Sequence, residues 1–261
     1  MCNELPCDEH TPLPTTRCKT ATIDTKRTDM ENIYQTLMQL PLFQGVSRAK
    51  LLELVEKTRF HFLKYEDGEK VASRATACTH LKFLLSGSIR CEMSTYDGKV
   101  RLIQTLHAPD IIAPDHIFGR STHYPGNYYA EGQVGLMQID KSTFMSFMQD
   151  EPIFLINMLN ILSRRSQKSK ESLLSISNGD LRERLAYWIL NLTSRNATDI
   201  HINARQRDLY SYFGVQRTAL LNTLAEMKQE KIIDYTINEV HILDRRALRD
   251  MLLEGIEFME E

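Results

Sequence analysis

Near its C-terminus the chain runs Gln206-Arg-Asp-Leu-Tyr-Ser-Tyr-Phe-Gly214-Val-Gln-Arg217-Thr-Ala-Leu-Leu-Asn222-Thr-Leu-Ala-Glu-Met227. The apolar residues of this stretch have the spacing of two helices that share one small core; they are Leu209, Phe213, Val215, Leu220, Leu224 and Met227. Gly214 supplies the corner between the helices, because glycine adopts left-handed backbone conformations at little cost. The stretch therefore predicts a helix, a tight turn and a second helix.

The outward face of the second predicted helix is polar where that helix begins. It carries Gln216, Arg217, Thr218 and Asn222. Hydrogen-bond donors and acceptors at the start of a helix are what a protein needs to contact base edges in the major groove of DNA. An ordinary antiparallel helix pair with a solvated polar face gives the same local pattern. The stretch alone leaves both interpretations open.

Composition places the chain among ordinary globular proteins. Its 261 residues are enough for one large or two small domains, with 42% hydrophobic and 25% charged residues. The sequence contains neither an apolar run of about 18 residues nor a secretory signal, so we expect a cytoplasmic protein with no membrane span.

The net charge of −2 does not itself indicate that the protein binds nucleic acid. Between Arg195 and Lys228, however, five basic residues stand against three acidic ones, a modest local bias that fits DNA.

The N-terminal half is predicted to contain a flexible arm, then helices, then a series of short strands. Residues 1–28 are rich in Thr, Pro and charge, which predicts a flexible arm. Helices are predicted over 29–38 and after Ser47, which has the side chain of an N-cap. From 59 to 140, short runs of β-branched and aromatic residues predict about eight strands, with turns at Asp67-Gly68, Ser86-Gly87, Tyr96-Asp97-Gly98 and Pro109-Asp110. This spacing is typical of a β-sandwich or jelly roll.

Helices dominate the remainder. A short helix over 141–149 precedes a helix of about 25 residues that begins at Pro152 and is apolar at both ends. A helix of that length needs a packing partner, and we expect the same helix of a second subunit. It ends at Asn178 and Gly179, and Asp180 with Glu183 forms the capping pattern of the next helix. These three residues (Asn178, Gly179 and Asp180) predict a hinge.

The end of the chain completes the pattern. The helix after the hinge is expected to reach Asn196, and the predicted helix pair over 206–227 follows it. Residues 232–243 predict two short strands about an Asn238-Glu239 turn, which would form a wing. A last helix is expected over 245–253.

A β-roll, a long helix, a capped hinge and a winged helix-turn-helix together resemble the Crp/Fnr family of bacterial transcription regulators. The resemblance spans residues 29–251. Its most specific segment is Asp208-Leu-Tyr-Ser-Tyr-Phe-Gly-Val-Gln-Arg-Thr-Ala-Leu220, which is similar to the D-L-A-x-x-L-x-V-x-R-S-A-L form common in members from Bacteroidetes-type bacteria. It implies an α+β fold with a cyclic-nucleotide-binding-like β-roll (jelly roll), a long dimerisation helix and a C-terminal winged helix-turn-helix.

The resemblance also implies roles for individual residues. In the family, the position of Arg217 contacts a guanine and that of Gln206 touches the phosphate backbone. The family usually has Arg where this chain has Asn222, and often Glu where it has Thr218. The DNA site of better-known members is therefore not expected to apply here. Gln206, Gln216, Arg217, Thr218 and Asn222 are the predicted DNA-binding residues.

The cyclic-nucleotide residues of the family are missing. Members that bind cAMP carry Gly-Glu in the turn that holds the ribose, and Arg-Ser-Ala or Arg-Thr-Ala shortly afterwards for the cyclic phosphate. Here the turn holds Ala113-Pro114, and the later segment runs Thr122-His-Tyr-Pro-Gly-Asn-Tyr-Tyr-Ala130. A buried cyclic phosphate needs a cation, and a ribose needs a hydrogen-bonding group. We therefore expect an effector other than cAMP.

An iron–sulfur cluster and haem stay open as cofactors. The Fnr branch ligates a cluster through N-terminal cysteines and one cysteine of the roll, which invites comparison with Cys2, Cys7 and Cys18. The expected fourth position is Met137, so Cys78 or Cys91 would have to substitute. Some members bind haem, and the roll offers possible axial ligands in His61, His80, His107, His116, His123, Met93 and Met137. Ordinary structural roles explain these residues more simply: the roll cysteines and the methionines as core residues, the histidines as surface or hydrogen-bonded residues, and the arm cysteines as thiols without a function.

These observations predict an effector- or redox-gated transcription regulator, with a flexible arm (1–28), an effector-sensing roll (29–150), a dimerisation helix (151–178) and a winged helix-turn-helix domain (179–261). The expected partners are double-stranded DNA with a pseudo-palindromic site, a second copy of the chain, and RNA polymerase. One alternative is a constitutive dimeric DNA binder whose roll is vestigial, with Tyr124, Tyr128 and Tyr129 filling the old pocket. A metal-dependent cupin-like enzyme is disfavoured because the roll has no His-x-His pair.

Overall fold

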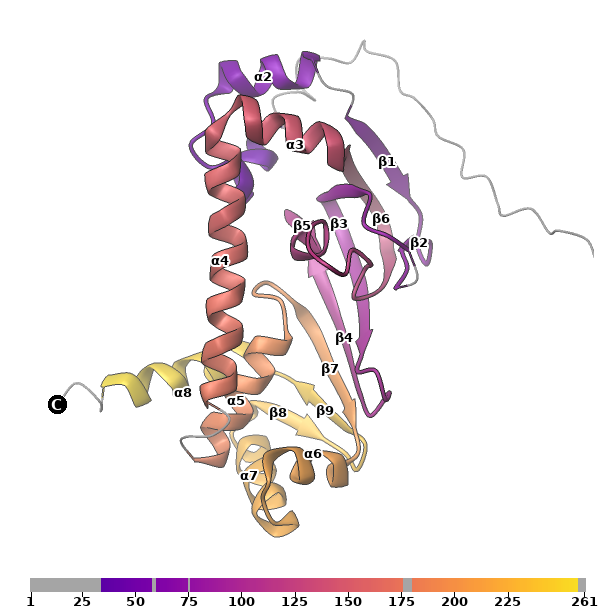
Figure 1. The fold of residues 1–261 in the computed structure, drawn as a ribbon. Coiled ribbons are helices and arrows are strands. Elements are labelled where there is room, and N and C mark those ends of the chain that lie inside the picture. Colours follow the sequence, from indigo (N-terminus) through magenta and orange to yellow (C-terminus); the bar gives the residue numbers. More distant parts are fainter. Residues whose placement is uncertain (1–33, 58–59, 75, 176–179, 258–261) are drawn as a thin grey trace, which may run out of the picture.

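The computed structural model describes residues 34–57, 60–74, 76–175 and 180–257. The predicted arm and two of the hinge residues, Asn178 and Gly179, lie outside these ranges. In Figure 1 a β-rich region and the C-terminal helices lie one above the other, and the long helix α4 runs along one side of both. None of the helices in the described ranges combines the length and apolar character needed to cross a membrane.

The N-terminal helices agree with the prediction within the described ranges, and residues 29–33 of the first predicted helix lie outside them. Residues 34–38 are helical, a 3-10 turn η1 spans Pro41–Phe43, and α2 spans Arg48–Lys57. The N–H of Lys50 donates to Ser47 Oγ at 3.3 Å, which confirms Ser47 as the cap of α2.

The roll is antiparallel and built around β3. Its strands are β1 (His61–Tyr65), β2 (Lys70–Ala72), β3 (His80–Ser94), β4 (Val100–His107), β5 (Asp110–Ile112) and β6 (Gly126–Asp140). Strand β3 pairs with β4, β5 and β6, and β6 pairs in turn with β1 and β2. The Tyr96-Asp97-Gly98 turn joins β3 to β4 as predicted, with the Thr95 N–H donating to the Val100 carbonyl at 2.9 Å.

The prediction of a turn at Ser86-Gly87 is wrong, because both residues lie within strand β3. We expected about eight short strands in the roll, but β3 and β6 each run for 15 residues, and β3 passes straight through Ser86-Gly87. The β3–β6 register shifts on both sides of Ser86, which marks a bulge. Gly87 has a φ of 84°, and a Cβ there would lie 2.4 Å from the Gln133 carbonyl oxygen. The glycine therefore allows two strands to approach closely instead of reversing the chain.

The middle helices are α3 (Lys141–Asp150), α4 (Pro152–Ser175) and α5 (Leu181–Leu192). Pro152 occupies the first position of α4, where its missing N–H is harmless. Asp180 caps α5 as expected, since its Oδ1 accepts from the Glu183 N–H at 2.8 Å. Helix α5 ends at Leu192, short of the predicted Asn196.

The C-terminal region, which we call the winged region, contains a strand that we did not predict. It comprises β7 (Thr198–Ala204), α6 (Gln206–Phe213), α7 (Arg217–Gln229), β8 (Ile233–Tyr235), β9 (Glu239–Ile242) and α8 (Arg245–Glu257). Strands β8 and β9 form the predicted wing, although Glu239 begins β9 and does not lie in the turn. The missed strand β7 has a clear signal, because every second residue, Ile200, Ile202 and Ala204, is buried.

A single sheet of nine strands joins the roll to the winged region. Strand β4 pairs with β7, from Val100 opposite Ala204 to Thr105 opposite Thr198, and β9 and β8 continue the sheet beyond β7 (Figure 1). Two side-chain contacts reinforce this pairing. The Ser194 N–H donates to buried Gln104 Oε1 at 2.8 Å, and His107 Nε2 lies 2.6 Å from Thr198 Oγ1. We call the β4–β7 pairing with these two contacts the interdomain clasp.

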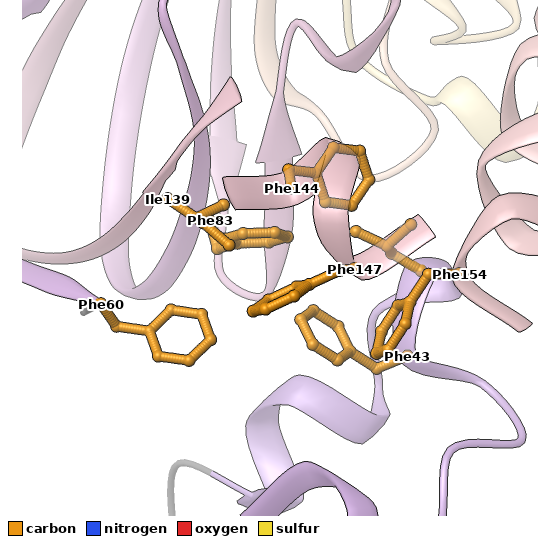
Figure 2. A pocket seen from close by; sticks show the side chains of 8 residues that line it. Phe43, Phe60, Phe83, Ile139, Phe144, Phe147 and Phe154 are labelled. Atoms are coloured by element: carbon orange, nitrogen blue, oxygen red, sulfur yellow. The ribbon is translucent and has the colours of Figure 1, made fainter. Parts of the chain in front are cut away.

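The core is divided into two clusters. One runs from the roll interior through the clasp into the winged region, and the other joins the N-terminal helices, the outer side of the roll, α3 and α4. Figure 2 shows the aromatic side chains of the second cluster around a cavity of about 10 Å³. A space of that size holds at most one water molecule. The aromatic cluster is therefore packed core and not a ligand pocket.

Candidate nucleic-acid interface

The predicted helix-turn-helix is present. Helix α6 ends at Gly214, which has φ 63° and ψ 34°, and α7 starts at Arg217 after Gln216 as N-cap residue. The left-handed conformation at Gly214 explains why glycine occupies the corner. The shared core consists of five buried residues, with half-buried Val215 beside them: Leu209, Phe213, Leu220, Leu224 and Met227.

Four predicted DNA contacts lie together on the exposed side of α7. They are Gln216, Arg217, Thr218 and Asn222, and all are exposed. Within the described residues, the Arg217 guanidinium has no hydrogen-bond or ion-pair partner. Helix α7 lies at the end of the molecule farthest from α2 and α3 (Figure 1). The side chain of Gln216 does not cap α7, so the N–H groups of its first turn are free to meet a phosphate.

Gln206 is not in this group. It is half-buried, its Nε2 donates to the Thr236 carbonyl at 3.3 Å, and its backbone N–H donates to the Ile237 carbonyl at 3.1 Å. The structure thus places Gln206 where α6 meets the wing. This position fixes α6 relative to β8 and β9.

Residues of α5 support the helix pair, and sequence reasoning missed them. Arg184 donates from Nη2 to the Phe213 carbonyl, and its guanidinium lies 5.7 Å from the centroid of the Phe213 ring. Trp188 packs edge-on against the same ring at 5.6 Å. Arg182 Nη1 donates to Glu230 Oε1 at 2.7 Å, which joins α5 to the end of α7. No local pattern distinguishes these arginines, because their partners are 29 and 48 residues away.

Cys78 and Cys91, the roll cysteines considered for a cluster, are buried and free. Burial raises the pKa of the Cys78 thiol to about 11 and that of Cys91 to about 12, while hydrogen bonds with Tyr124 and Tyr128 oppose these shifts. Each of the two thiols lies in the packed core beside its own tyrosine, and the described part of the roll contains no group of three or more Cys, His, Asp or Glu side chains whose ligand atoms lie close together. Met137 is fully buried in the core. Within the roll, therefore, the donor set does not fit a cluster; Cys2, Cys7 and Cys18 lie outside the described residues.

The histidines proposed for haem are dispersed. His61 and His123 are exposed, and His116 is half-buried in the 3-10 turn η2 (Pro114–His116). His80 pairs with Asp140 at 2.8 Å, while His107 belongs to the interdomain clasp and also contacts Ser88 Oγ at 2.8 Å. Met93 is half-buried against the core. None of these side chains lines the aromatic cavity or the open hollow beside Lys99 and Arg205.

The turn that holds the nucleotide in cAMP-binding members has a different chemistry here. Ala113 adopts φ 45°, and Pro114 is buried. The next residue, Asp115, pairs through Oδ1 with Arg165 Nη1 of α4 at 2.5 Å. This ion pair connects the turn directly to the long helix.

Comparisons with known proteins agree with this architecture. A family model described as "Cyclic nucleotide-binding domain" matches residues 62–151, and one described as "Crp-like helix-turn-helix domain" matches residues 183–251. A "CRP-like cAMP-activated global transcriptional regulator" of Mycobacterium tuberculosis is 21% identical over 225 residues, which cover 82% of this chain and 97% of the relative.

Two further similarities extend over most of the chain. The "Probable transcriptional regulator flp" of Lacticaseibacillus casei is 21% identical over 214 residues, covering 81% of this chain and 95% of the relative. The catabolite activator protein structure of Thermus thermophilus aligns with a TM-score of 0.46 and 17% identity, covering 82% of this chain and 99% of that one. Both the M. tuberculosis and the L. casei relatives are named as transcriptional regulators, the second as a probable one. With its nucleotide-binding-type roll and DNA-binding helix-turn-helix, this chain belongs to the Crp/Fnr family of transcription regulators.

Proposed function

We propose that the protein is a homodimeric regulator whose roll controls promoter binding in response to a signal other than cAMP. The interdomain clasp is the observation that carries this proposal, because it joins the sensory roll and the DNA-binding region in a single continuous sheet. Residues 29–150 would sense the signal, 151–178 would dimerise and 179–261 would bind DNA. The promoter-bound dimer would then act on RNA polymerase.

A second copy of the chain is expected along α4. Leu155, Ile156 and Leu159 lie on one face of α4 and are 43%, 52% and 53% exposed. Exposed large apolar side chains at this spacing are typical of a helix that packs against another helix. Two copies joined along α4 would place two α7 helices on successive major grooves, about 34 Å apart, and so read a pseudo-palindrome.

Through the clasp, a movement of the roll strand β4 would be transmitted to the helix pair α6–α7. Strand β4 lies between the roll strand β3 and the winged-region strand β7, and β7 leads through Arg205 into α6. A ligand or redox change that shifts β4 therefore shifts the helix pair. Such a signal acts only if it favours one of two arrangements of the clasp, because a ligand cannot change an equilibrium between states that it binds equally.

The chemistry of the roll argues against cAMP as that signal, although the M. tuberculosis relative is named as cAMP-activated. The ribose turn carries Ala113 and Pro114, and the carboxylate that follows them, Asp115, is already paired with Arg165. Tyr124 and Tyr128 are 4% and 3% exposed and stack edge-on at 5.9 Å in the roll interior. A cyclic phosphate would need a cation where these two rings lie.

The same two tyrosines favour the alternative of a constitutive DNA binder. They fill the interior with Cys78 and Cys91, whereas Tyr129 is half-buried between Lys70 and Arg90 at the surface. A roll packed in this way would serve as a scaffold that holds α4 and the clasp in one arrangement. In a signal-gated regulator the arrangement of the interdomain clasp would change, whereas in a constitutive DNA binder it would stay the same.

We expect the protein to bind its own promoter region with strong salt dependence, and cAMP to leave the affinity unchanged. Salt dependence follows from counterion release by the cations around α6 and α7. Fluorescence anisotropy with labelled promoter DNA at several salt concentrations measures both quantities. A random duplex of equal length is the control. Absence of salt-sensitive binding would contradict the proposal, and a cAMP-dependent gain in affinity would restore the nucleotide as effector.

Hydrogen–deuterium exchange should separate gated from constitutive binding. If the clasp belongs to a gate, promoter DNA will change the protection of amides in β4 and β7 while those of β1 and β6 stay the same. The reason is that clasp amides exchange only when the strand pair opens, whereas β1 and β6 belong to the roll alone. Unchanged protection in β4 and β7 would favour the constitutive scaffold.

A further inference from the structure

A cluster of two histidines and an aspartate lies in the winged region, on a sheet position that the DNA interface does not use. Asp199 and His201 are two residues apart in β7, and His241 stands directly opposite His201 in β9. Residues at positions i and i+2 of a strand, and residues paired across two strands, project from the same face of a sheet. The pattern Asp-x-His opposite a His thus brings three side chains together.

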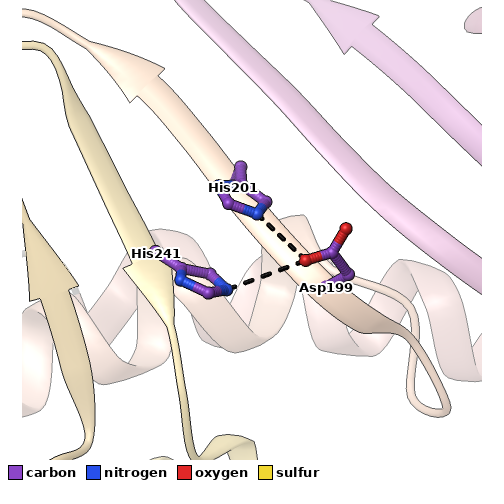
Figure 3. Close-up of side chains that lie close together, drawn as sticks. All are labelled: Asp199, His201 and His241. Carbon is purple, nitrogen blue, oxygen red and sulfur yellow. Dashed lines mark hydrogen bonds and ion pairs between the residues drawn. The ribbon is translucent and has the colours of Figure 1, made fainter.

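The donor atoms of this cluster converge. His201 Nε2 lies 3.0 Å and His241 Nε2 3.8 Å from the same oxygen, Asp199 Oδ1, and a donor atom from each residue lies within 4.8 Å of the others (Figure 3). Around a tetrahedral zinc ion, donor atoms are about 3.3 Å apart, given zinc–ligand distances of about 2.0–2.1 Å. The two imidazole rings are stacked, with centroids 4.1 Å apart, so we expect them to rotate about their Cβ–Cγ bonds on binding.

A second contact supports a metal-binding role for His201. Its Nδ1 lies 2.6 Å from Glu239 Oε1, which leaves Nε2 as the atom directed to Asp199. A carboxylate behind a histidine is the usual outer contact of a metal-bound imidazole, since it fixes the ring and the tautomer. Asp199 also adopts φ 46°, a left-handed conformation that is uncommon outside glycine and that holds the aspartate beside both rings.

We propose that the winged region binds one divalent transition-metal ion, zinc(II) by its chemistry, through Asp199, His201 and His241, with Glu239 orienting His201. Two imidazoles and a carboxylate suit zinc better than magnesium or calcium, which prefer all-oxygen sites. The side chains are 66%, 27% and 35% exposed, so an ion can enter from solvent and water can complete its coordination. The ion would link β7 to β9, close to the interdomain clasp.

Protonation of His201 offers a different explanation of the same contacts. Burial lowers the pKa of His201, but hydrogen bonds to Asp199 and Glu239 and their negative charges outweigh burial, so the pKa is raised. An imidazolium between two carboxylates would need no metal. The nearby Asp234, opposite His241 on β8, is engaged by Lys228 at 2.5 Å and does not complete the cluster. Metal and proton compete for the same nitrogen, so the test must detect the ion itself.

The experiment uses the full chain, freed of metal with a chelator. Zinc(II) is titrated in competition with a chromophoric chelator, and cobalt(II) replaces zinc for absorption spectra. We expect one ion per chain, cobalt d–d bands of a nitrogen–oxygen site, and a rise in melting temperature that depends on metal. A sulfur-to-cobalt charge-transfer band as the only signal would assign the metal to cysteine thiolates and overturn the proposal.

Matched variants locate the ion. His241→Ala should lose the nitrogen–oxygen site, and Asp199→Asn, which tolerates the left-handed backbone, should weaken it without disturbing the fold. Glu239→Gln is expected to lower the affinity by about 10-fold to 100-fold, as removal of an outer contact does. His61→Ala, an exposed histidine of β1, is the control and should bind as the wild type does. Equal binding by His241→Ala and wild type, or no binding by either, would refute the metal site.

Discussion

Replacing Arg217 by alanine is expected to weaken sequence-specific DNA binding strongly while leaving the fold and the dimer intact. Arg217 is exposed at the first turn of α7 and has no partner within the described residues, so its removal costs the free protein little. A bidentate arginine–guanine contact is worth about 1–3 kcal/mol in each half-site. Two half-sites lose about 2–6 kcal/mol together, on the order of a 30-fold to 20,000-fold loss in affinity.

Competition anisotropy measures this effect as the ratio of affinities for promoter and random DNA. The ratio should fall because base contacts carry specificity, whereas affinity for random DNA should change only a few-fold. Arg246→Ala removes the same charge from the exposed side of α8 and serves as the control. An Arg217→Ala protein that kept the wild-type ratio would show that α7 does not read the promoter through Arg217.

Replacing Leu159 by aspartate is expected to convert the protein to a monomer and so to remove promoter binding by a different route. Leu159 is 53% exposed in the single chain and lies beside Leu155 and Ile156. If a second α4 covers this face, the variant buries a charge in an apolar contact, which costs several kcal/mol. The dimer then dissociates, and each monomer can contact only one half-site.

Sedimentation velocity gives the oligomeric state, and anisotropy gives promoter affinity on the same samples. Phe62→Asp is the control, because Phe62 is an apolar residue of similar exposure, 46%, on β1, a strand that pairs with β6 at the edge of the sheet. Circular dichroism at equal concentration shows whether both variants are folded. A Leu159→Asp protein that stayed dimeric would place the subunit contact elsewhere.

Local patterns predicted the features that depend on nearby residues. The helix-turn-helix follows from apolar spacing and one glycine, and both capped helices follow from Ser47 and Asp180, whose side chains reach backbone N–H groups three residues away. Such contacts close within one helical turn, so a short window of sequence contains both partners. Strand β7 also had a local signal, the alternation of Ile200, Ile202 and Ala204, which we missed.

The roll shows where local patterns fail. Ser86-Gly87 has the composition of a turn, yet it forms a bulge in β3, because the β6 backbone at Gln133 packs against Gly87. Whether a glycine reverses a chain or allows two strands to approach depends on a partner strand about 45 residues away in this chain. The sequence around Gly87 does not contain that partner. The same argument applies to Arg184 and its contact with Phe213.

The sequence by itself determined the succession of roll, long helix and helix-turn-helix, the family, and the helix pair predicted to face DNA, since these depend on periodicity and capping within a few residues. Only the tertiary structure decided that β4 pairs with β7, that Tyr124 and Tyr128 fill the roll, and that Asp199 and His201 meet His241. The physical reason is the same in each case. Strand pairing and packing join residues that are distant along the chain, and closing those loops is favourable only when the whole core forms around them.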